Sequence, residues 1–204
     1  MRTRMKSDER RAAIVESAIH LFAEKGFRGT TTRELAAALR VTEPVLYQHF
    51  RTKKDLYGAI IEAKACAAEE VAAEFLNLAN TDDDRAFFTA LGSLVLERFE
   101  ADTELLRLLL YSALERHELS DMFFDRVVSD FLKQVAGYIR RRVRAGAFRP
   151  VNPDAAARGL IGMFHYHGMI WTLHPGRFGK PNRKKVVNEL VTLFLDGVTQ
   201  PAKG

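Results

Sequence analysis

Residues 43–48 bring together side chains whose chemistry suits the base edges exposed in duplex DNA. Gln48 could pair with adenine, Glu43 could accept a hydrogen bond from cytosine N4, and Val45 could contact a thymine methyl group. Hydrogen-bond donors of the kind that fix a protein on the phosphate backbone surround them. These donors are Thr31, Thr32, Tyr47, His49 and Lys53.

Two short helices separated by a turn would place these side chains. Thr31 with Glu34 three residues later is a capping-box pattern, and it predicts that a helix begins there. Thr42 caps a second helix that has Pro44 in its first turn. In that second helix Leu46 and Phe50 are four residues apart and face inward, so the polar side chains point outward. The pattern predicts a helix-turn-helix, whose second helix lies in the major groove.

The segments 30–36 and 41–50, followed by Thr52, Lys53 and Leu56, resemble the TetR family of bacterial transcriptional regulators. The match covers about residues 10–57. The resemblance implies a homodimer that represses transcription from a palindromic double-stranded DNA operator and is released by a small-molecule effector. Carried over by position and joined to the donors above, the expected DNA-binding residues are Thr31, Thr32, Arg40, Thr42, Glu43, Pro44, Val45, Tyr47, Gln48, His49 and Lys53.

The turn between the two helices departs from the family pattern. Leu39 and Arg40 stand where the family usually has Ala-Gly. Glycine there supplies a left-handed backbone conformation, which costs any other residue about 1 kcal/mol or more. We therefore expect a turn that is either strained or reshaped, and Arg40 could offset the cost by contacting a phosphate.

Composition places the whole chain among soluble globular proteins, because 47% of its 204 residues are hydrophobic and 28% are charged. Its one cysteine, Cys66, excludes an intramolecular disulfide framework. No signal-peptide pattern opens the chain, and no stretch approaches the roughly 18 apolar residues needed to span a bilayer. We expect a cytoplasmic protein that does not enter a membrane.

Charge is distributed unevenly along the chain. Residues 1–57 hold 12 Lys and Arg against 7 Asp and Glu, residues 58–130 hold 6 against 16, and residues 131–204 hold 13 against 3. The asymmetry favours separate roles for the segments, although the acidic and basic blocks could also complement each other on solvated faces. We expect a DNA-binding domain over residues 1–54 and a ligand-binding and dimerisation domain over residues 55–204.

Helical periodicity runs through the chain and strand signals are nearly absent, so we predict an all-α fold of about nine helices. Gly26 should end the first helix, and a helix of about 22 residues should begin near Thr52. A long helix should cover residues 124–146. Asn152 caps the next helix, and the last one passes through residues 186–195.

Aromatic residues and methionines recur at helical spacing beyond residue 86. Such a stripe is typical of a packed core, but it could also line an apolar effector cavity with few polar anchors. The candidates for that cavity are Phe87, Phe88, Leu91, Phe99, Leu109, Tyr111, Met122, Phe123, Phe131, Met163, Phe164, His167 and Trp171.

The last two helices are expected to form a four-helix interface with their partners in a second copy. Met163, Ile170, Leu190 and Phe194 are the candidate contacts there. We expect no cofactor and no metal, because His165 and His167 are two residues apart and point to nearly opposite sides of a helix.

Three other functions compete with a ligand-controlled repressor. A DNA-binding dimer without an effector could organise DNA or recruit a protein. A role at a membrane surface is disfavoured, because the chain lacks a basic amphipathic helix with an exposed apolar face. An enzyme is disfavoured, since the chain has neither a Glu-x-x-His pair of the di-iron type nor a phosphate-binding glycine loop.

Overall fold

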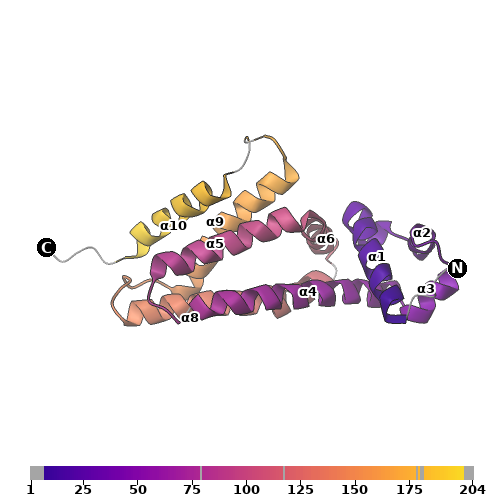
Figure 1. Cartoon of the computed structure of the whole chain (residues 1–204), viewed down its shortest axis with the longest axis horizontal. Coiled ribbons are helices and arrows are strands. Elements are labelled where there is room, and N and C mark those ends of the chain that lie inside the picture. The colour runs from indigo at the N-terminus through magenta and orange to yellow at the C-terminus, as the bar shows by residue number, and fades with distance from the viewer. Residues whose placement is uncertain (1–6, 79, 117, 178, 180–181, 200–204) are drawn as a thin grey trace. The chain divides into compact units, whose positions relative to one another are not determined.

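The computed structural model of the chain describes residues 7–78, 80–116, 118–177, 179 and 182–199. These residues confirm the all-α fold, and Figure 1 shows how the helices follow one another. One predicted helix is divided, because residues 124–128 form a π-helical segment, η1, ahead of α8. The helices are α1 Ser7–Gly29, α2 Thr32–Ala38, α3 Glu43–His49, α4 Lys53–Leu78, α5 Asp84–Ala101, α6 Thr103–Leu114, α7 Glu118–Phe123, η1 Phe124–Val128, α8 Ser129–Arg144, α9 Pro153–Leu173 and α10 Arg183–Val198.

The chain divides into two compact units. The first contains residues 1–68 and 104–126, and the second contains residues 69–103 and 127–204. The expected domain boundary at residue 54 follows the helix-turn-helix, whereas the first unit runs further along α4 and includes most of α6. Residues distant in sequence therefore help to hold the segment that carries the DNA-reading pattern.

Aromatic packing forms the core of the first unit. Phe22 of α1 meets Tyr57 of α4 edge to face, with ring centroids 4.9 Å apart, and Phe27 meets the same tyrosine at 5.4 Å. The Tyr57 hydroxyl donates to the backbone oxygen of Leu108 in α6 at 3.1 Å. Burial raises the pKa of Tyr57 to about 12. This one side chain therefore links three helices of the unit through both its ring and its hydroxyl.

The end of α1 is irregular, as the sequence predicted from Gly26. This residue has φ 74° and ψ 176°, which breaks the regular helix. The buried Thr30 hydroxyl donates to the Gly26 carbonyl at 2.8 Å and lies 3.3 Å from the Leu21 carbonyl. A side chain thus satisfies backbone acceptors that the interrupted helix leaves without an amide partner.

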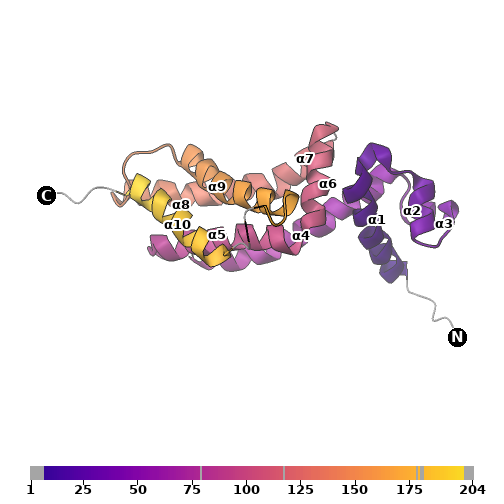
Figure 2. The same ribbon diagram turned by 90° about the horizontal axis from the view of Figure 1, so that it is seen from above.

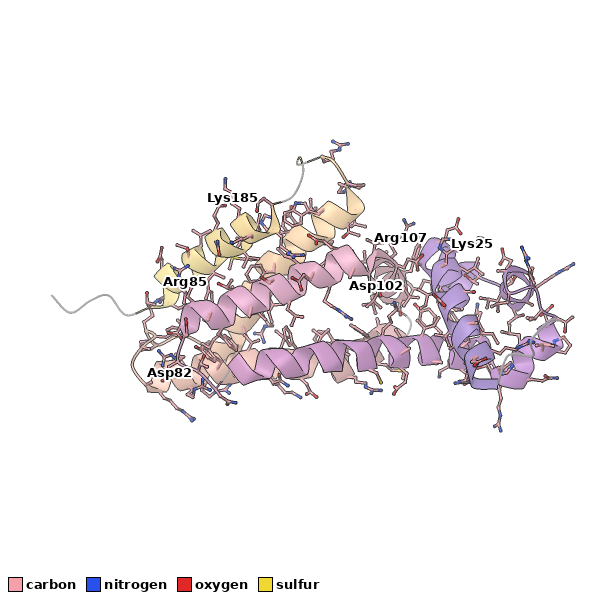
Figure 3. The ribbon with its side chains drawn as sticks, in the orientation of Figure 1. Lys25, Asp82, Arg85, Asp102, Arg107 and Lys185 are labelled. Carbon is pink, nitrogen blue, oxygen red and sulfur yellow. The ribbon has the colours of Figure 1, made fainter. Side chains whose placement is uncertain are left out.

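Side chains from α4 and α6 bind the same end of α1. Arg107, which Figure 3 labels, donates from Nε to the Ala23 carbonyl at 3.1 Å. Tyr111 donates to the Glu24 carbonyl at 3.3 Å. Lys53 Nζ donates to the Phe27 carbonyl at 2.6 Å. Positive groups at a helix C-terminus also offset its partial negative charge.

The second unit is a helical bundle in which α5 packs on α9 and α10, and α8 packs on α9 (Figure 2). Tyr138 stacks on Phe87 with ring centroids 3.7 Å apart and donates to Asp84 at 2.7 Å. Arg142 Nε donates to the same carboxylate at 2.8 Å. The first turn of α5 is therefore fastened to α8 by a half-buried ion pair and a buried ring.

Substituting Gly92 with alanine should destabilise the second unit by about 1–3 kcal/mol, because added volume strains a filled core. A Cβ at position 92 would lie 2.5 Å from Phe164 Cζ, and Phe164 is fully buried. Gly137→Ala is the matched control, since among the described residues nothing beyond the chain neighbours and the backbone of its own helix comes within 4 Å of a Cβ there. That control should gain about 0.5–1 kcal/mol from helix propensity. Denaturant unfolding measures both, and equal effects would contradict the packing argument.

Candidate nucleic-acid interface

The first helix of the predicted pair begins with the expected capping box. The Glu34 amide donates to Thr31 Oγ1 at 3.2 Å, and the Thr31 amide donates to Glu34 Oε2 at 2.9 Å. Lys25 Nζ donates to Glu34 Oε1 at 2.7 Å, and this bond together with those from Thr31 lowers the pKa of Glu34 to about 2. The Thr31 hydroxyl, expected to bind phosphate, is thus engaged in holding the start of α2.

The second helix, α3, presents the outward face that the sequence predicted. Leu46 and Phe50 are buried, with 2% and 3% of their surfaces exposed, whereas Tyr47 is 45% exposed. Pro44 and Gln48 are also exposed, and Val45 is half-buried. Thr42 occupies the N-cap position, but its side chain makes no capping hydrogen bond. That hydroxyl is therefore available for another partner.

Arg40 decides between the two expected forms of the turn. Its φ is 53°, so the backbone keeps the left-handed conformation that glycine normally supplies. The amides of Arg40 and Val41 donate to the carbonyls of Ala37 and Ala36, each at 3.0 Å. The turn is strained rather than reshaped, and the exposed side chain of Arg40 adds a cation beside α3.

Arg11 is a residue of this region that the sequence analysis missed. Its Nη1 donates to the His49 carbonyl at 2.7 Å, and its guanidinium lies 4.1 Å from the centroid of the Phe50 ring. A cation at the last turn of α3 offsets the helix dipole, and its stacking on an aromatic ring adds to the attraction. The contact joins positions 38 residues apart, so no local spacing could have indicated it.

Lys53 binds backbone carbonyls at the end of α1. Its Nζ donates to the carbonyls of Phe27 at 2.6 Å and Thr30 at 2.8 Å, and it lies 4.1 Å from the centroid of the Phe27 ring. Burial lowers the pKa of this lysine. Two of its three donors are engaged with backbone, so Lys53 connects α4 to the end of α1, and its phosphate contact stays a prediction.

The expected base-reading residue Glu43 is already hydrogen-bonded inside the protein. Thr32 Oγ1 donates to Glu43 Oε2 at 2.8 Å, and the Tyr47 hydroxyl is 3.5 Å from Thr32 Oγ1. These three side chains connect the first turn of α2 to two positions of α3. Gln48 is exposed and Val45 is half-buried, and their contacts with bases stay predictions, while Glu43 bonds to α2.

The expected cavity residues are spread over both units. Leu109, Tyr111, Met122 and Phe123 belong to the first unit, and the other nine belong to the second. Four of the nine are fully buried core residues rather than exposed lining, namely Phe87, Phe88, Leu91 and Phe164. The half-buried residues of the second unit are Phe99, Phe131, Met163, His167 and Trp171. A cavity that they line stays a prediction.

One expected dimer contact is corrected. Phe194 is only 9% exposed and meets the Phe88 ring edge to face at 5.0 Å, so it packs within its own protomer. Its neighbour Leu193 is 65% exposed, and Tyr166 of α9 is 60% exposed. Tyr166 lies three or four residues from Met163 and Ile170 on α9, and Leu193 lies three residues after Leu190 on α10, so they share helix faces with these expected contacts. Met163, Ile170 and Leu190 are half-buried.

Within the described ranges, no group of three or more His, Cys, Asp or Glu side chains is arranged to hold a metal ion. Likewise, none of the helices in the described part of the chain is long and apolar enough to cross a membrane.

Two family models cover most of the chain. Residues 14–60 match the bacterial regulatory proteins of the tetR family, and residues 89–197 match the C-terminal domain of AefR-like transcriptional repressors. The chain is 43% identical over 53 residues to the class C tetracycline repressor protein of Escherichia coli, covering 26% of this chain and 24% of the relative. It is 37% identical over 59 residues to the transcriptional activator FasR of Mycolicibacterium smegmatis, covering 29% and 27%. The alignments span about a quarter of the length of these relatives.

Other similarities extend over nearly the whole chain. The transcriptional repressor KstR2 of Rhodococcus jostii is 25% identical over 197 residues, which cover 94% of this chain and 92% of the relative. The crystal structure of AibR with isovaleryl coenzyme A and operator DNA has a TM-score of 0.73 at 23% identity, covering 91% of this chain and 97% of that one. KstR2 of Mycobacterium tuberculosis has a TM-score of 0.72 at 18% identity, covering 96% and 98%. These solved structures share the fold.

Replacing Arg40 with glycine should raise the free energy of unfolding by about 1 kcal/mol, because glycine adopts the left-handed conformation without strain. Arg40→Ala is the control, since it removes the same guanidinium and keeps the unfavourable φ of 53°. Thermal unfolding of the two variants measures the difference. A glycine variant no more stable than the alanine variant would show that the turn carries no strain.

Replacing Lys53 with methionine should lower the free energy of unfolding by about 1–3 kcal/mol, because two backbone acceptors lose a charged donor. Arg51→Met removes a nearby cation whose side chain is exposed, and it should unfold almost like the wild type. Denaturant unfolding measures both variants. If Lys53→Met keeps its stability but flattens the salt dependence of DNA binding, the lysine instead contacts phosphate.

Proposed function

Because the chain belongs to the TetR family of bacterial transcriptional regulators, we propose that it binds a palindromic operator as a homodimer and releases it when a small, mostly apolar effector binds. Members of the family are DNA-binding regulators of transcription and not enzymes. Operator recognition, dimerisation and effector control are each supported by a different part of the chain.

The outward face of α3 is the observation that carries the proposal. Leu46 and Phe50 hold the helix by its buried side, while Gln48 and Tyr47 stand exposed on the other. In the major groove, Gln48 and Val45 would meet base edges, and Tyr47 would donate to a phosphate. The exposed Arg40 would add a positive charge near the DNA backbone.

Exposed apolar side chains on the last two helices support a dimer. Tyr166 and Leu173 on α9 and Leu193 on α10 are 60%, 41% and 65% exposed. Apolar surface of this kind commonly marks an interface between protein chains. A symmetric dimer would place two copies of α3 about one DNA turn apart, roughly 34–36 Å, which matches the half-sites of a palindrome.

An effector site in the second unit is supported by its half-buried residues and by a protein of the same fold. Phe99 meets His165 edge to face at 4.9 Å, and His167 meets Trp171 at 5.8 Å, so aromatic surfaces lie beside the core without being enclosed in it. AibR has been solved with both isovaleryl coenzyme A and operator DNA. A typical coupling of about 1–3 kcal/mol would weaken operator binding about 5- to 150-fold when the effector is bound.

Selection from a library of randomised duplexes should yield a palindrome bound by a dimer. If the dimer neutralises about eight phosphates, the logarithm of the binding constant should fall with the logarithm of salt concentration at a slope near −7. Gln48→Ala should change the preferred base at one position of each half-site, whereas Tyr47→Phe should weaken all duplexes alike. Fluorescence anisotropy at several salt concentrations measures these effects.

The same assay separates the proposed regulator from other functions. A protein that is monomeric in sedimentation and ignores every duplex at low ionic strength would overturn the proposal. Titrating the bound complex with a library of apolar compounds tests effector control. If no compound releases the operator, the regulator acts without an effector.

A further inference from the structure

Three polar side chains form a continuous hydrogen-bonded chain between α2 and α3. Thr32 is the first residue of α2, Glu43 is the first residue of α3, and Tyr47 lies one turn further along α3. Thr32 Oγ1 donates to Glu43 Oε2 at 2.8 Å, and the Tyr47 hydroxyl donates to Thr32 Oγ1 at 3.5 Å. Thr32 and Glu43 are half-buried, while Tyr47 is 45% exposed.

The chemistry of the three groups fixes the direction of these bonds. A carboxylate only accepts hydrogen bonds, so the single proton of the Thr32 hydroxyl points to Glu43. The Thr32 oxygen then accepts the proton of the Tyr47 hydroxyl. Both hydroxyl protons are thus used inside the protein, and Glu43 Oε2 already accepts one of them.

DNA phosphates compete for the same protons, because phosphate oxygens are also acceptors. The bond from Thr32 to Glu43 is short and ends on a charged group, which makes it the stronger of the two. The bond from Tyr47 to Thr32 is at the limit of hydrogen-bonding distance. Tyr47 can therefore turn its proton to a phosphate while Thr32 remains bonded to Glu43.

We propose that Glu43 is a positioning residue of the DNA interface, which holds the Thr32 hydroxyl and so sets α3 against α2 for Gln48 and Val45 to read bases. The inference rests on the proposed DNA-binding function. Thr32 then acts as the partner of Glu43 rather than as a phosphate contact, and Tyr47 is the donor of this group that reaches the backbone. The Glu43 carboxylate also repels phosphates, so its removal should strengthen the electrostatic attraction to any DNA while it loosens the position of α3 against α2.

A double-mutant cycle on the full-length protein tests the pair. The variants are Glu43→Ala, Thr32→Val and the double variant, with Glu43→Gln as the conservative replacement that keeps an accepting oxygen. Glu16→Gln is the control for the loss of one negative charge, because Glu16 is exposed on α1. The quantity measured is the affinity for the selected operator divided by that for an unrelated duplex, and thermal unfolding of each variant is recorded beside it.

Glu43→Ala and Thr32→Val should each lower this specificity ratio about tenfold, the least expected when a hydrogen bond to a charged group is lost. The double variant should be no worse than Thr32→Val alone, because Thr32→Val already removes the bond to Glu43 together with the long bond from Tyr47. Glu43→Gln should stay within about threefold of the wild-type ratio, since it retains an acceptor for Thr32. Thr32→Val removes the bond with little change of volume. If Glu43→Ala does not fold, the specificity ratio of Thr32→Val still tests the proposal.

Three results would overturn the inference. The effects of the two single variants could add in the double variant, Glu43→Gln could change the preferred base at one operator position, or every variant could match the wild type. The second result would make Glu43 a base-reading residue. Failure of the wild-type protein to bind any duplex would overturn the proposed function as well, and it is distinguished because it precedes any comparison of variants.

Discussion

The backbone acceptors at the end of α1 are the constraint on which the first unit depends. Gly26 interrupts the helix, and six carbonyls around it accept from side chains. Thr30 donates to Leu21 and Gly26, Lys53 to Phe27 and Thr30, Arg107 to Ala23, and Tyr111 to Glu24. A buried carbonyl without a donor costs free energy comparable to a lost hydrogen bond. The donors to this helix end come from the turn before α2, from the start of α4 and from two turns of α6, so the end of α1 connects these three segments.

Locally coded features could be predicted from the sequence. The capping box of Thr31 and Glu34, the interruption at Gly26 and the inward face of Leu46 and Phe50 all follow from residues a few positions apart. These features are decided by helix geometry and by the chemistry of one turn. The sequence left the form of the turn open between strained and reshaped, and the φ of 53° at Arg40 decides for the strained form.

Features that depend on distant partners could not be predicted. Lys53 binds carbonyls 23 and 26 residues earlier, and Arg107 binds one 84 residues earlier, so nothing in their neighbourhood distinguishes them from solvated or DNA-binding cations. The orientation of Phe194 likewise depends on a distant residue. Both flanks of α10 carry apolar residues, and only the position of Phe88 shows that Phe194 faces the protomer core while Leu193 faces outward.

The inclusion of residues 104–126 in the first unit bears on how such regulators can be recombined. A chimaera joined at residue 54 would transplant α1 without Arg107, Tyr111 and Glu115, whose side chains bind its last turns. In the chimaera, the backbone carbonyls of Ala23 and Glu24 would lose these donors, and the second protein would not supply others. To exchange DNA specificity between relatives, residues 1–68 and 104–126 should therefore be transferred together, although they are not contiguous in sequence.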